Sequence, residues 1–87
     1  MRISKDMFDI IFKEFEPVLT ESVLFSNSAM WQITELYDIC NIRAAYDDAI
    51  EGWDIRGDRD YVFFDIKRKE DAEAIVRFIH SLEVLSI

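Results

Sequence analysis

Cysteine and histidine are almost missing from this sequence of 87 residues, which contains one of each. A single cysteine cannot form an internal disulfide, and a structural zinc site draws its four ligands mainly from these two residue types. We therefore expect no disulfide, no metal ion and no cofactor. Because a lone thiol is in keeping with a reducing compartment, we also expect a cytoplasmic protein.

Proline and glycine are nearly as scarce, with one and two residues. This composition is not that of a linker or a low-complexity tail, and the two isolated glycines do not form a phosphate-binding loop. No apolar run approaches the roughly 20 residues of a membrane span, and none has the pattern of a cleavable leader. The sequence therefore predicts a single domain over residues 1–87 that does not bind a membrane.

Basic residues are also in short supply, since 10 lysines and arginines face 18 acidic residues and the net charge is −8. A protein that binds the phosphate backbone needs a basic surface, so a direct nucleic-acid partner is not expected. The hydrophobic fraction is 51 % and the aromatic fraction 14 %, which is enough to build a core and excludes intrinsic disorder.

Hydrophobic periodicity predicts three helices. The first follows Ser4 and ends near Phe15, because Pro17 disfavours helical geometry in the residue before it. The third is expected near residues 71–82. The second is expected between Asp38 and Gly52, on an apolar stripe at helical spacing that consists of Ile39, Ile42, Tyr46, Ala49, Ile50 and Trp53.

Two hairpins are predicted between these helices. One covers residues 20–37, where the segment 28–37 also fits a helix, and the other covers residues 53–66 around a turn at 56–59. The fold class that follows is α+β: a mostly antiparallel sheet of two hairpins packed against about three helices, in the order α-β-β-α-β-β-α.

Acidic and aromatic residues gather between Tyr46 and Tyr61, where six carboxylates stand against two arginines. A charge run of this kind is often only a solvated face. It is also the composition of a site for a basic partner, because aromatic side chains anchor interfaces and carboxylates steer cationic surfaces. The predicted partner-binding residues are Asp47, Asp48, Glu51, Trp53, Asp54, Asp58, Asp60 and Tyr61.

The function predicted from this surface is a small acidic module that inhibits or regulates a basic protein, such as a nucleic-acid-binding enzyme. Immunity proteins, antitoxins and phage-encoded inhibitors have a similar composition, and some inhibitors of this kind mimic nucleic acid. A mimic spreads its acids along an elongated face. The concentration of acids between Asp47 and Asp60 favours a local patch instead.

Two other functions remain open. The chain could assemble as a homo-oligomer, for instance a dimer, through the apolar run Tyr61–Phe64 or through the phenylalanine-rich first helix. A small ligand-binding domain or enzyme would use Cys40, His80 or paired carboxylates. No motif supports the Cys40–His80 pair, so we predict no catalytic residue and no enzymatic activity. A calcium loop is excluded at Asp54, because Gly57 then occupies the fourth loop position and not the sixth.

Overall fold

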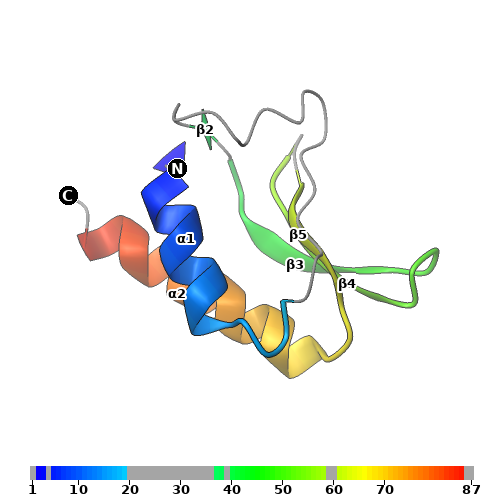
Figure 1. Ribbon diagram of the computed structural model, residues 1–87. Coiled ribbons are helices and arrows are strands. Elements are labelled where there is room, and N and C mark those ends of the chain that lie inside the picture. Colours follow the sequence, from blue (N-terminus) through cyan, green and yellow to red (C-terminus); the bar gives the residue numbers. More distant parts are fainter. Residues whose placement is uncertain (1, 4, 20–36, 39, 59–60, 86–87) are drawn as a thin grey trace.

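The computed structural model describes residues 2–3, 5–19, 37–38, 40–58 and 61–85 (Figure 1). These residues form a small α+β fold in which every strand pairing is antiparallel. The elements, in chain order, are β1 (Arg2–Ile3), α1 (Lys5–Glu14), β2 (Tyr37–Asp38), β3 (Arg43–Asp47), β4 (Gly52–Arg56), β5 (Tyr61–Ile66) and α2 (Lys69–Leu85).

The strands form two sheets. β1 pairs with β2 in a two-stranded ladder, and the main sheet has the order β3-β4-β5. α2 contacts all three strands of the main sheet, and α1 packs against α2 (Figure 1). The β3–β4 turn lies at the end of the molecule farthest from the N- and C-termini in this view. The sheet therefore presents one face to the helices and carries a projecting hairpin.

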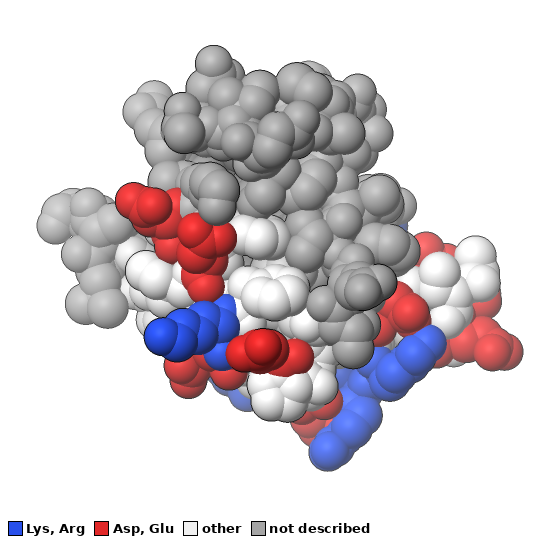
Figure 2. Space-filling model, in the orientation of Figure 1, with Lys and Arg blue, Asp and Glu red and all other residues white. Residues whose placement is uncertain are grey.

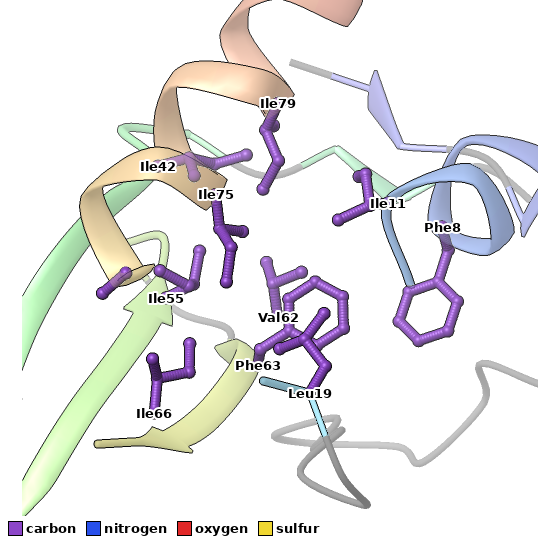
Figure 3. Close-up of a cluster of buried hydrophobic side chains, with 11 residues drawn as sticks. Phe8, Ile11, Leu19, Ile42, Ile55, Val62, Phe63, Ile66, Ile75 and Ile79 are labelled. Carbon is purple, nitrogen blue, oxygen red and sulfur yellow. The ribbon is translucent and has the colours of Figure 1, made fainter. Parts of the chain in front are cut away.

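The core lies between the helices and the main sheet (Figure 3). Ile75 and Ile79 of α2 and Ile55 of β4 are fully buried, and they meet Ile11 from α1. The ring of Phe8 stacks on that of Phe63, with 5.2 Å between their centroids, and so joins α1 to β5. Burial of such side chains contributes about 1.5 to 3 kcal/mol each, which makes this cluster the main source of stability.

β5 departs from a regular strand. Its pairing with β4 shifts register twice, and Asp65 adopts a positive φ of 67°. Trp53 and Ile55 of β4 are two positions apart, whereas their partners Ile66 and Phe63 on β5 are three positions apart. The extra residue of this bulge allows Phe63 and Ile66, which are an odd number of residues apart, to turn to the same core. Both are buried.

The structure confirms several sequence predictions. α1 ends at Glu14 ahead of Pro17, the helix predicted at 71–82 is α2, and the hairpin predicted at 53–66 is β4–β5. No described helix has the length and apolar character of a membrane span. The predicted hairpin at residues 20–37 lies almost wholly outside the described residues, as does the choice between strand and helix at 28–37.

The helix predicted between Asp38 and Gly52 is wrong. The chain instead forms β3, a four-residue turn and the start of β4, and Gly52 pairs with Asp47 within the sheet. Tyr46 and Trp53 are seven residues apart, which puts them on one side of a helix but also opposite each other in a hairpin with this loop length. The described elements therefore include two helices, and the order α-β-β-α-β-β-α is not confirmed.

Gly52 has a packing role in this arrangement. A Cβ atom at this position would lie 3.3 Å from the backbone oxygen of Ile66 and 3.4 Å from Oδ1 of Asp65. The missing side chain therefore allows β4 to approach the bulged end of β5 closely. Gly52 does not end a helix, as the sequence had suggested.

Candidate functional site: the β3–β4 hairpin

The turn that joins β3 to β4 is closed by its own side chains. Oδ1 of Asp47 accepts a hydrogen bond from the backbone N–H of Ala49 at 2.9 Å, and the backbone oxygen of Asp48 accepts one from the N–H of Glu51 at 3.3 Å. Glu51 has a φ of 50°, in the left-handed region. An aspartate that bonds to the backbone two residues on favours a turn over a helix.

Two carboxylates lie on the outside of this turn. Asp48 and Glu51 are exposed, and neither forms an ion pair with any residue that the structure describes. Figure 2 shows acidic side chains at the projecting end of the molecule, where Figure 1 places this turn. Both carboxylates are therefore available to a partner.

An aromatic pair lies directly behind the two carboxylates. Tyr46 and Trp53 face each other across β3 and β4, with ring centroids 5.4 Å apart and an angle of 66° between the rings. Tyr46 is 53 % exposed, whereas Trp53 is half-buried and packs against the core. Nζ of Lys69 lies 5.8 Å from the centre of the Trp53 ring, at the start of α2. We call Tyr46, Asp48, Glu51 and Trp53 the hairpin tip.

The predicted acidic surface does not form one face. Asp58 follows β4, at the end of the hairpin opposite to Asp48 and Glu51. Its carboxylate accepts hydrogen bonds from Nδ2 of Asn41 at 2.8 Å and from Nη1 of Arg43 at 3.3 Å. The charge of Asp58 is thus matched within the chain. A five-residue strand at about 3.3 Å per residue separates it from the tip.

Asp54 is buried and not part of the exposed surface, with 1 % of its area accessible. Nη2 of Arg56 donates a hydrogen bond to its Oδ2 and lies 3.9 Å from Oδ2 of Asp47. Burial raises the pKa of Asp54 above its ordinary value, Arg56 acts against that shift, and the neighbouring Asp47 adds to it. This trio forms an internal electrostatic cluster that ties β3 to β4.

The remaining predicted site residues are only partly visible. Asp60 lies outside the described residues, and for Tyr61 the structure describes the backbone within β5 and not the side chain. Of the eight predicted residues, the structure brings Asp48, Glu51 and Trp53 together at the tip, with Asp47 holding the turn. Tyr46 was predicted to lie on the apolar stripe of a helix, and its exposure was therefore not predicted.

Cys40 and His80, the two residues considered for catalysis, are not part of the hairpin tip. Nε2 of His80 is 3.3 Å from the backbone oxygen of Ile42, which links α2 to the chain just before β3. Cys40 is exposed. No group of three or more potential metal ligands occurs among the described side chains. A ligand-binding or enzymatic role stays the alternative prediction.

Comparisons with known proteins give no relative from which to take a function. The chain matches no protein-family model, and neither curated proteins nor solved structures gave a match. The geometry and charge of the hairpin tip are therefore the basis for a function.

Proposed function

We propose that this chain is a protein-binding module that inhibits or regulates a basic partner, and that the hairpin tip is its binding site. The observation that carries the proposal is the exposure of Asp48 and Glu51 on a projecting turn without ion pairs in the described chain. A lysine or arginine of a partner can meet these carboxylates without breaking a salt bridge to any residue that the structure describes. Asp54 and Asp58 are already matched by Arg56 and Arg43.

The aromatic pair gives this surface an anchor. Tyr46 is exposed, and its edge contact with Trp53 holds it in place. Tyrosine and tryptophan are enriched among the residues that contribute most to protein interfaces, because a rigid ring buries much area with little loss of conformational entropy. A basic residue packed on Tyr46 would contact both the ring face and the neighbouring carboxylates.

The turn is also ordered before any partner arrives. The Asp47–Ala49 hydrogen bond and the paired strands fix the positions of Asp48 and Glu51. A preformed binding surface loses less entropy on association than a mobile loop does. A short acidic hairpin of this kind suits selective recognition of a complementary basic groove, with an on-rate that falls as salt screens the charges.

A charge-reversal experiment tests the proposal. Asp48→Lys with Glu51→Lys changes the tip, while Glu14→Lys with Glu16→Lys makes the same change in net charge at the end of α1. All four residues are exposed. Each variant and the wild type serve as bait in nuclease-treated lysate, followed by a direct affinity measurement on any captured basic protein. Circular dichroism verifies that each variant is folded.

The expected result is a basic protein held by the wild type and the α1 variant but lost from the tip variant. Adding Tyr46→Ala should weaken the same complex. Equal capture by all three baits, or equal loss of capture from both variants, would reject the hairpin tip as the binding site. The carboxylates of Asp48 and Glu51 would then be only solvent-exposed surface groups.

A further inference from the structure

A groove runs between β3 and the first half of α2. Its volume is about 270 Å³, and it is lined by Ile42, Arg43, Ala44, Glu73, Val76 and Arg77. Sites for drug-sized ligands usually enclose roughly 300 to 1,000 Å³ and are mostly apolar, so this groove is small for such a ligand. One wall is a strand, and this makes an added strand a fitting occupant.

β3 is an edge strand within the described sheet. It pairs with β4 alone among the described strands, and the β3–β4 register is continuous from Arg43 to Asp47 without a bulge. Proteins commonly protect such edges with proline, lysine or a bulge. β3 has no proline, lysine or bulge, and its two charged residues, Arg43 and Asp47, lie at its ends, so the middle of its outer edge is regular enough to accept another strand.

The charges on β3 are self-complementary. Arg43 begins the strand and Asp47 ends it, and each lies two positions from the central Ala45. When two copies of β3 pair antiparallel around Ala45, Arg43 of each copy lies opposite Asp47 of the other. Opposite charges on facing positions stabilise such a pair, whereas like charges would oppose it. Within one copy, Arg43 is half-exposed and pairs with Asp58, and Asp47 lies 3.9 Å from Nη2 of Arg56. Because exposed ion pairs of this kind contribute little, Arg43 and Asp47 can share or exchange these partners for each other across the new pairing.

The charges on α2, the helix beside the groove, are also self-complementary. Glu73 and Arg77 are exposed, lie one turn apart, and have no ion pair among the described residues. A two-fold axis perpendicular to the sheet would run two α2 helices antiparallel to each other. Glu73 of each copy then faces Arg77 of the other, with Val76 between them. Two independent elements thus fit a second copy of this chain.

We propose that this chain forms a two-fold dimer by pairing β3 with β3 of a second copy, which makes a continuous six-stranded antiparallel sheet. A two-fold contact requires a surface that is complementary to itself. The Arg43–Asp47 and Glu73–Arg77 arrangements meet that condition, and a generic acidic or basic peptide does not need it. The hairpin tips remain outside the pairing, so the dimer would present two binding sites.

Sedimentation equilibrium of the full chain, from low micromolar to several hundred micromolar concentrations, tests this proposal. Arg77→Glu should weaken the dimer about tenfold, because it replaces two exposed attractions by two repulsions. The double variant Glu73→Arg with Arg77→Glu should restore wild-type association, since the complementary pattern returns with the charges exchanged. A monomeric wild type, or a dimer equally stable in all three proteins, would overturn the proposal.

A cross-link tests the register independently. In a Cys40→Ser background, Ala45→Cys places one thiol on each side of the axis, at a Cα separation of about 4.5 to 5.5 Å that allows a disulfide. We expect a disulfide-linked dimer under mild oxidation for Ala45→Cys and little for Ala49→Cys, which lies on the turn. Failure of Ala45→Cys to link in a folded protein would refute the β3 pairing. Because the tip residues are unchanged, the fate of this dimer does not depend on partner capture.

Discussion

The carboxylate of Asp47 and the backbone N–H of Ala49 are 2.9 Å apart, and this hydrogen bond starts the turn between β3 and β4. Oδ2 of the same carboxylate is 3.9 Å from Nη2 of Arg56. Asp47 therefore holds the hairpin in two ways, through the local turn and through a partner on the neighbouring strand. By holding the hairpin, Asp47 fixes the positions of the exposed Asp48 and Glu51.

Replacing Asp47 by alanine should lower the free energy of unfolding by about 1 kcal/mol, through the loss of the turn hydrogen bond. Asparagine keeps the oxygen that accepts from Ala49, so Asp47→Asn should retain more than half of that stability. Urea denaturation of the three proteins measures the effect. If alanine and asparagine are equally destabilising, the charge toward Arg56 and not the turn hydrogen bond is the important contribution.

Glu51 adopts a left-handed conformation, with a φ of 50°. Glu51→Gly should raise the free energy of unfolding by about 0.5 kcal/mol, because that conformation costs a non-glycine residue roughly 1 to 2 kcal/mol and the freedom of unfolded glycine offsets part of the gain. Ala49→Gly is the matched control in the same turn. Its φ is not positive, so it should only destabilise. Equal losses for both variants, seen in thermal or urea unfolding, would contradict the conformational explanation.

The pKa of Asp54 is raised above its ordinary value of 3.8, chiefly by burial. At pH values between the pKa of Asp54 in the unfolded chain and its higher pKa in the folded chain, the folded chain binds more protons. The stability that protonated Asp54 contributes is therefore complete below the unfolded-state pKa and is lost as the pH rises through the folded-state pKa. Asp54→Asn does not titrate. The stability of the wild type relative to this variant should therefore fall as pH rises from about 4.

Urea denaturation of both proteins at several pH values measures that difference. Parallel stability profiles for the wild type and Asp54→Asn would show that burial of this carboxyl is not linked to folding. A difference that grows in favour of the wild type as pH rises would mean that Arg56 outweighs burial and holds the carboxylate in its charged form.

Two adjacent isoleucines in α1 provide a matched test of the core. Ile11 is fully buried, whereas Ile10 is 49 % exposed. Ile11→Ala should lower the free energy of unfolding by about 2 to 5 kcal/mol, because it leaves a cavity between α1, α2 and β5. Ile10→Ala should change it by less than about 0.5 kcal/mol. Comparable losses would indicate that α1 does not pack as described.

The helices were predictable because their signals are local. The apolar spacing of Ile11 and its neighbours and the stop at Pro17 act within a few residues, and α1 ends where they predict. The segment from Asp38 to Gly52 was not predictable in this way, because the spacing of Tyr46 and Trp53 satisfies both a helix and a hairpin. The Asp47 turn and the pairing of β3 with β4 decided between them.

The same distinction between local and long-range signals applies to the candidate site. Asp48 and Glu51 are close in sequence, and one turn keeps them together in space. Asp54 and Asp58 belong to the same acidic run, but strand alternation buries one and the length of β4 carries the other to the far end of the hairpin. The groove that joins Arg43 to Arg77 has no counterpart in the sequence, since the residues come from distant segments.

The sequence by itself determined the acidic charge, the α+β class, and the positions of α1, α2 and the β4–β5 hairpin. Each of these depends on composition or on contacts between near neighbours. Only the tertiary structure decided that Tyr46 is exposed, that Asp54 is buried beside Arg56, and that β3 forms an edge next to α2. These properties depend on which segments pack together, and a periodic pattern does not encode that choice when two folds satisfy it equally.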